Sequence, residues 1–186
     1  MSNSLLEIRN LLIEAEIEGA WKPIVNGLSL NLQKGEVVGL IGESGAGKST
    51  LGLAALGYTK PGCRIVSGSI CFDGQELTTL PEKQLRKLRG VRVSYVAQSA
   101  AAAFNPAHRL IDQFSETSIQ HGRMNASEAS QRGRELFRQL ELPDPDHFGE
   151  RYPHQVSGGQ LQRAMTAMAM GCQPDIVVFD EPTTAL

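Results

Sequence analysis

Apolar residues are grouped into short runs separated by turn residues through the first half of the chain, a pattern typical of β-strands. Runs of this kind predict strands at residues 5–9, 11–17, 26–32, 68–72 and 91–97. A further run at 36–41 predicts a buried strand that leads into a helix at 51–56. Most of the strands are therefore expected in the first half of the chain.

The apolar spacing changes to a helical period beyond residue 104, and helices should dominate residues 105–152. Asn125 is a suitable N-cap, with Glu128 three residues later. The apolar face expected to follow consists of Ala129, Gly133, Leu136, Phe137 and Leu140. A final run at 175–179 is typical of a strand buried on both faces. The pattern predicts an α/β protein whose core is interrupted by a helical insert between Gln98 and Ser157.

The segment between the strand at 36–41 and the helix at 51–56 matches the phosphate-binding pattern G-x-x-x-x-G-K-[ST]. It consists of Gly42, Glu43, Ser44, Gly45, Ala46, Gly47, Lys48, Ser49 and Thr50. Between a strand and a helix, such a loop turns its backbone N–H groups toward a phosphate chain. Lys48 would reach the β- and γ-phosphates, and the Ser49 hydroxyl would bind Mg²⁺. The alternative, a glycine-rich turn without a ligand, does not require these flanking elements.

Two carboxylates, Asp180 and Glu181, follow the apolar run at 175–179, at the end of the strand where open α/β sheets bind ligands. Consecutive side chains of a strand point to opposite sides, so the two need different roles. Asp180 suits the Mg²⁺ shell beside Ser49. Glu181 suits polarising a water for attack on the γ-phosphate. An acidic pair at an ordinary solvated strand end is the alternative, and the upstream phosphate loop argues against it.

A third motif opens the helix that precedes this strand, at Ser157, Gly158, Gly159 and Gln160. Ser157 and Gln160 would form a capping box, which any helix can use. The following stripe is expected to be core: Leu161, Ala164, Met165, Met168 and Ala169. Capping does not explain the glycine pair, because glycine is a poor helix former. The pair is explained if an anion, the γ-phosphate held by another subunit, approaches the bare helix end.

Composition narrows the function only modestly. A net charge of −2 and a pI near 6.1 argue against a general nucleic-acid binder. The three cysteines have no C-x-x-C spacing, so reduced thiols are expected rather than a metal site. No apolar run approaches the ~18 residues of a membrane-spanning helix. We expect a cytoplasmic chain whose membrane role, if any, comes through a partner.

Together the three motifs, in this order, resemble the ATP-binding-cassette (ABC) ATPase family over essentially the whole chain. Residues 156–160 resemble its L-S-G-G-Q signature, with Val156 in place of leucine. The resemblance implies ATP and Mg²⁺ as ligands and a P-loop NTPase core with an N-terminal antiparallel β subdomain and an inserted α-helical subdomain. The expected divisions are 1–97 for the β subdomain and P-loop core, 98–157 for the Q-loop and helical subdomain, and 158–186 for the signature helix and acidic strand.

The resemblance also implies roles for residues outside the three motifs. Gln98 matches the Q-loop glutamine, which contributes to the metal site and to catalysis and couples the nucleotide to a transmembrane partner. Trp21 is the candidate for the adenine-stacking aromatic upstream of the P-loop, and packing at the surface is the alternative role. The signature residues imply a second ABC subunit, identical or homologous, whose ATP they would contact.

A finer resemblance points to the oligopeptide, dipeptide and nickel importer branch. It rests on Phe104-Asn105-Pro106, on Tyr152-Pro153-His154 and on the ending at residues 181–186. The acidic-Pro pair usual after the Q-loop glutamine is replaced here by Ser99 and alanines. The implied partners are transmembrane permeases and, indirectly, an extracytoplasmic solute-binding protein. The chain would lie on the cytoplasmic face of the membrane.

The family pattern leads us to expect a chain cut short, because Leu186 stands just before the D-loop aspartate. The C-terminal part of the fold, with its switch histidine, would then be missing. Two alternatives to a transporter subunit remain. One is a soluble ABC ATPase, disfavoured by the lack of a heptad run or Cys-x-x-C between Gln98 and Ser157. The other is a catalytically incomplete nucleotide-binding fragment.

Overall fold

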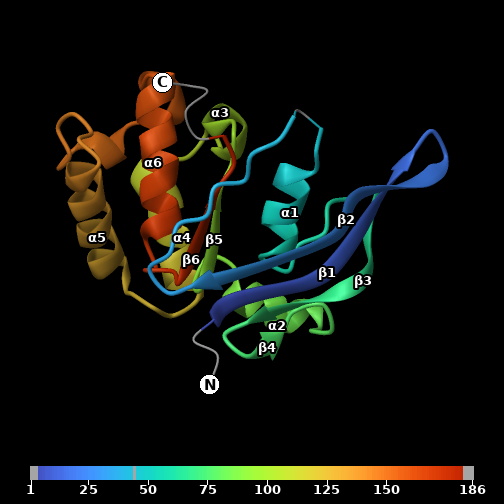
Figure 1. Cartoon of the computed structure of the whole chain (residues 1–186). Helices are drawn as coiled ribbons and strands as arrows, with labels where there is room; N and C mark the ends of the chain where they lie inside the picture. The colour runs from blue at the N-terminus through green and yellow to red at the C-terminus, as the bar shows by residue number, and fades with distance from the viewer. Residues whose placement is uncertain (1–3, 44, 182–186) are drawn as a thin grey trace. The chain divides into compact units, whose positions relative to one another are not determined.

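The structure is a computed structural model that describes residues 4–43 and 45–181. The chain divides into two compact units, Met1–Arg86 and Lys87–Leu186 (Figure 1). Among the described residues, no helix combines the length and the apolar character needed to cross a bilayer. The three divisions expected from the sequence remain a prediction.

The first unit is built on an antiparallel sheet with the strand order β2-β1-β3-β4 (Figure 1). Its strands are β1 (Ser4–Ile17), β2 (Ala20–Gln33), β3 (Cys63–Phe72) and β4 (Gln75–Glu76). Helix α1 (Lys48–Ala54) lies between β2 and β3 in the chain, and helix α2 (Glu82–Leu88) follows β4 and extends two residues past the end of this unit. The inward-facing side chains Ile8, Leu11, Ile13, Ile70 and Phe72 are at most 1% exposed. The antiparallel β subdomain is confirmed.

The strands expected at 5–9 and 11–17 form one long strand, β1, with a bulge at their junction. Asn10 lies in the left-handed region, with φ 46°, and the pairing register shifts between Ile8 and Leu11. Gly68 on β3 faces this bulge, where a Cβ would stand 2.6 Å from the Asn10 carbonyl oxygen. Only glycine leaves room for so close a backbone approach, and its φ of +94° suits glycine as well.

The prediction of a buried strand at residues 36–41 is wrong. These residues form neither helix nor strand, and the side chains of Val37 and Ile41 are 94% and 99% exposed. A strand exists only through hydrogen bonds to a neighbouring strand, and no strand in the described part of the chain pairs with this segment. Apolar composition alone therefore could not make residues 36–41 a strand.

The second unit combines a two-stranded parallel sheet, β5 (Val93–Val96) and β6 (Ile176–Phe179), with a group of helices. The helices are α3 (Ala100–Ala103), α4 (Leu110–Gln120), α5 (Ala126–Gln139) and α6 (Gly158–Met170), with short 3-10 turns at Phe148–Glu150 and Pro153–Gln155. Helix α6 lies between α5 and the strand pair (Figure 1). The helical insert expected after Gln98 is present.

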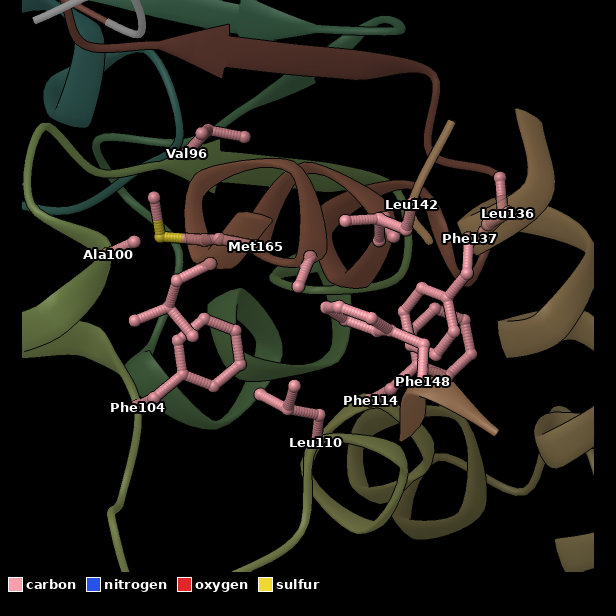
Figure 2. Close-up of a cluster of buried hydrophobic side chains, with 13 residues drawn as sticks. Val96, Ala100, Phe104, Leu110, Phe114, Leu136, Phe137, Leu142, Phe148 and Met165 are labelled. Carbon is pink, nitrogen blue, oxygen red and sulfur yellow. The ribbon is translucent and has the colours of Figure 1, made fainter. Parts of the chain in front are cut away.

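The core of the second unit is an aromatic and aliphatic cluster between α4, α5 and α6 (Figure 2). The Phe137 ring meets Phe114 and Phe148 edge to face, with centroids 5.7 and 5.2 Å away. Val96 of β5 and Met165 of α6 belong to the same cluster, which joins the strand to the helix.

Strand β6 is less buried than the sequence predicts. Ile176 is buried, but Phe179 is 47% exposed. Among the described strands, β6 pairs with β5 alone, so its other edge has no neighbour there to cover it.

Candidate functional site

The phosphate-loop residues of the first unit adopt the conformation that their glycines permit. Gly45 and Gly47 have φ values of +84° and +82°, and α1 begins directly afterwards at Lys48. A Cβ on Gly47 would stand 2.6 Å from the Ile24 carbonyl oxygen of β2, so a larger residue cannot take its place without displacing backbone. Helix α1 thus begins three residues earlier than the sequence suggests. Ser44 lies outside the described residues.

Lys48 folds back over its own loop. Its Nζ donates to the carbonyl oxygens of Gly42 and Glu43, both at 2.9 Å. An ammonium held over the loop is placed where phosphate oxygens could replace the carbonyls as acceptors. Ser49 and Thr50 follow in the first turn of α1, where Thr50 is buried. Binding of a phosphate chain by this loop and its lysine remains a prediction.

In the second unit, the two carboxylates after β6 have different partners. The Tyr95 hydroxyl donates to Asp180 Oδ2 at 2.5 Å, and Gln98 Nε2 donates to Glu181 Oε2 at 2.8 Å. The Asp180 amide continues the parallel ladder by donating to the Val96 carbonyl at 3.0 Å. Two adjacent carboxylates with separate partners can perform separate tasks, as the alternation of side chains suggested.

Glu181 has an unusual backbone for a side chain of its size, with φ 47°. Left-handed conformations are uncommon outside glycine, and they occur often at functional sites. Here the turn follows the end of β6 directly and presents the carboxylate to Gln98, which lies just beyond β5. The structure therefore brings together Glu181, which was predicted from the end of the strand, and Gln98, which was predicted from the family resemblance.

Sequence reasoning missed Tyr95. Parallel pairing sets Tyr95 opposite Val178, so its long side chain reaches the carboxylate of Asp180, just past the end of β6. Burial, followed by the hydrogen bond and the charge of Asp180, raises the pKa of Tyr95 above its ordinary value. The only available signal was a tyrosine near the end of a short apolar strand, which does not identify its partner.

The signature residues form the N-terminus of α6 as expected. Ser157 Oγ accepts from the Gln160 amide at 3.3 Å, and Gln160 Oε1 accepts from the Ser157 amide at 3.0 Å, which completes a capping box. A Cβ on Gly158 would meet no atom within 4 Å. Of the predicted stripe, Leu161, Ala164 and Met165 are buried, and Met168 and Ala169 are partly buried against the same core cluster. Neither the capping box nor close packing requires a glycine at position 158.

Trp21 lies on β2 with the guanidinium carbon of Arg64 4.1 Å from its ring centroid. Arg64 is held in turn by Glu14, whose Oε2 accepts from Nη2 at 2.7 Å. The indole is 40% exposed. One face of Trp21 is therefore engaged by a cation, and stacking of an adenine on this residue remains a prediction.

The residues expected at the metal offer a hydroxyl, an amide and a carboxylate, from Ser49, Gln98 and Asp180 respectively. These hard oxygen ligands suit Mg²⁺, which proteins hold through one or two carboxylates together with substrate phosphates. The described residues contain no cluster of three or more His, Cys, Asp or Glu that could hold a metal ion, and the three ligands named here remain a prediction. The side-chain nitrogen of Gln98 donates to Glu181, and the side-chain oxygen is the acceptor atom that could bind a cation.

Similarity to known proteins extends over almost the whole chain. Residues 25–184 match the model of the ABC transporter family. The chain is 37% identical, over 98% of its length, to a probable peptide ABC transporter ATP-binding protein of Sinorhizobium fredii, of which it covers 55%. It is 38% identical to the dipeptide transport ATP-binding protein of Escherichia coli, with 98% of this chain and 56% of the relative covered. The chain thus spans about half the length of these curated relatives.

The fold is shared with solved ATP-binding cassettes. One is a dimeric cassette in a post-hydrolysis state bound to ADP and Pi, with a TM-score of 0.85 and 26% identity. The match covers 97% of this chain and 75% of that one. A second dimeric structure, of a bacterial ABC transporter cassette, matches with a TM-score of 0.84.

Proposed function

The chain belongs to the ABC transporter family, and on that premise we propose that it is an ATP-binding subunit that hydrolyses ATP to drive import of peptides or a similar small solute. The observation that carries the proposal is the pair of carboxylates after β6, each held by its own partner. A protein that only binds the nucleotide, without hydrolysing it, would not need a carboxylate such as that of Glu181 next to a glutamine. The P-loop supplies the nucleotide site.

In this proposal the phosphate chain lies on residues 42–50, where Lys48 exchanges the carbonyls of Gly42 and Glu43 for β- and γ-phosphate oxygens. Bound Mg²⁺ would supply charge neutralisation at the phosphates, with Ser49, Gln98 and Asp180 as its protein ligands. Glu181 accepts a proton from the attacking water, and Gln98 orients that carboxylate through its amide. Trp21 is the proposed contact for the base.

The signature residues act on a second subunit. The capped but otherwise open N-terminus of α6, with Gly158 clear of neighbouring atoms, suits a γ-phosphate presented from outside the chain. The solved dimeric cassettes support a paired arrangement. The pair would close when each ATP lies between one P-loop and the other subunit's residues 157–160, and transmembrane permeases at the cytoplasmic face would use that closure.

The solute assignment rests on the relatives, which are named as peptide and dipeptide transport proteins. Solute recognition in this proposal belongs to the permeases and to an extracytoplasmic binding protein. Co-purification with membrane proteins would support the transporter role, and its absence from a turnover-competent protein would favour a soluble ABC ATPase.

Lys48→Ala tests the nucleotide site. It removes the cation expected at the β- and γ-phosphates, and ATP affinity measured by calorimetry should fall at least ~10-fold, about 1.4 kcal/mol. Lys34→Ala, at an exposed turn position, is the matched control and should bind ATP as the unmodified protein does. Affinity of Lys48→Ala within about twofold of the parent, or ~0.4 kcal/mol, would refute the P-loop assignment.

A further inference from the structure

Tyr95 lies at the carboxyl end of β5, where its hydroxyl meets the first of the two carboxylates after β6. It donates to Asp180 Oδ2 at 2.5 Å. We propose that Tyr95 is a positioning residue for the Mg²⁺ site, holding the Asp180 carboxylate in the orientation in which it binds the cation. The inference rests on the proposed function, because it concerns the metal that accompanies ATP.

The strand pairing fixes where the hydroxyl can reach. β5 and β6 are parallel, with Tyr95 opposite Val178 and Val96 opposite Phe179. Side chains alternate along a strand, and Val96 points into the core cluster with α6 (Figure 2). Tyr95 therefore lies on the other face of the strand. There the phenol extends along β6 as far as Asp180, whose own amide is tied to Val96 at 3.0 Å.

Both ends of Asp180 are thus restrained, its backbone by the ladder and its carboxylate by Tyr95. A carboxylate has two oxygens, and a neutral hydroxyl can hold one without cancelling the charge that attracts a cation. Partners of this kind fix the orientation of a ligating side chain, and their loss commonly lowers metal affinity ~10–100-fold. The Glu181 carboxylate accepts a hydrogen bond from Gln98.

Because Tyr95 contacts Asp180 and Gln98 contacts Glu181, a change at Tyr95 is expected to act on the metal ligand Asp180. Removing the Tyr95 hydroxyl should lower the affinity for Mg²⁺ while leaving metal-free nucleotide binding intact. A purely structural role would instead lower stability and reduce both kinds of binding together.

The test is Tyr95→Phe, which deletes one oxygen and keeps the ring. Tyr58→Phe, on an exposed tyrosine outside the carboxylate pair, is the matched control. Calorimetry with a non-hydrolysable ATP analogue, in EDTA and over a series of Mg²⁺ concentrations, measures nucleotide and metal binding separately. Electron paramagnetic resonance of Mn²⁺ with the analogue bound gives metal affinity directly.

We expect Tyr95→Phe to need about 10-fold more Mg²⁺ for half-maximal effect and to bind Mn²⁺ about 10-fold more weakly. Its affinity for the analogue in EDTA should match the parent. In an Asp180→Asn background, the same change should have no further effect on metal binding, because the carboxylate it positions is gone. This second comparison also isolates the pair from any general loss of stability.

An unchanged Mg²⁺ requirement in Tyr95→Phe would overturn the inference. A lower requirement would also overturn it, because it would mean that the Tyr95 hydroxyl competes with the cation for Asp180. Additive losses in the double variant would overturn it too. A parent protein that binds no analogue in either EDTA or Mg²⁺ would instead overturn the proposed function itself. The two failures are therefore distinguishable in one titration series.

Discussion

Replacing Gly158 by alanine is expected to raise the stability of the protein and, at the same time, to lower its rate of ATP hydrolysis. Gly158 is the first residue of α6, its φ lies outside the left-handed region, and an added Cβ would meet no atom within 4 Å. The fold therefore tolerates alanine there without strain. Replacing such a glycine stabilises a protein by about 0.4–1 kcal/mol, chiefly by restricting the unfolded chain.

For a chain of this size a change of 1 kcal/mol raises the melting temperature by roughly 2–4 °C. The same methyl group would stand at the helix end where the partner subunit's γ-phosphate is proposed to dock. A misplacement of ~1 Å at a reacting group can cost a hundredfold in rate. We therefore expect Gly158→Ala to melt higher and yet hydrolyse ATP at least ~10-fold more slowly in the assembled pair.

The measurements are melting temperature without nucleotide and Mg²⁺-ATP turnover per folded molecule. Ala126→Gly makes the reverse exchange at the first residue of α5, away from the site. It should lower stability by up to about 1 kcal/mol and leave turnover unchanged. A Gly158→Ala protein that is stabilised and fully active would refute the idea that the glycine is there for an approaching anion.

Two further outcomes are expected. Glu181→Gln should bind ATP normally but hydrolyse it at least ~10²-fold more slowly, as for loss of a general base. It should also accumulate as a pair on size-exclusion chromatography with Mg²⁺-ATP. Turnover equal to that of the parent protein would eliminate the role given to Glu181. Phe137→Ala should cost about 3–5 kcal/mol in the free energy of unfolding, since the ring is 1% exposed and packs edge to face on Phe114 and Phe148; a loss below ~1 kcal/mol in denaturant titration would contradict that core.

Features that depend on neighbours in sequence could be predicted from the sequence alone. Both capping boxes, Asn125 with Glu128 and Ser157 with Gln160, are present as expected. Each involves residues three apart, so the helix start itself sets their geometry. The apolar stripe of α6 and the glycine-rich loop before α1 follow from the same local rules.

Features that depend on a distant partner were decided only by the tertiary structure. Residues 36–41 have the composition of a buried strand, but no described strand pairs with them, and they stay exposed. Asn10 looked like a break between two strands and is a bulge within β1, because β2 and β3 pair with the strand on both sides of it.

The carboxylate site shows the same division. The acidic motif identified Asp180 and Glu181 as residue types suited to metal binding and hydrolysis, and the family resemblance added Gln98. That Gln98 donates to Glu181, and that Tyr95 donates to Asp180, could not be known from their positions in the chain. Local sequence determines which groups are available and how each helix begins. The pairing of β5 with β6 decides which groups meet, because hydrogen bonds between distant residues form only where the fold brings their strands into register.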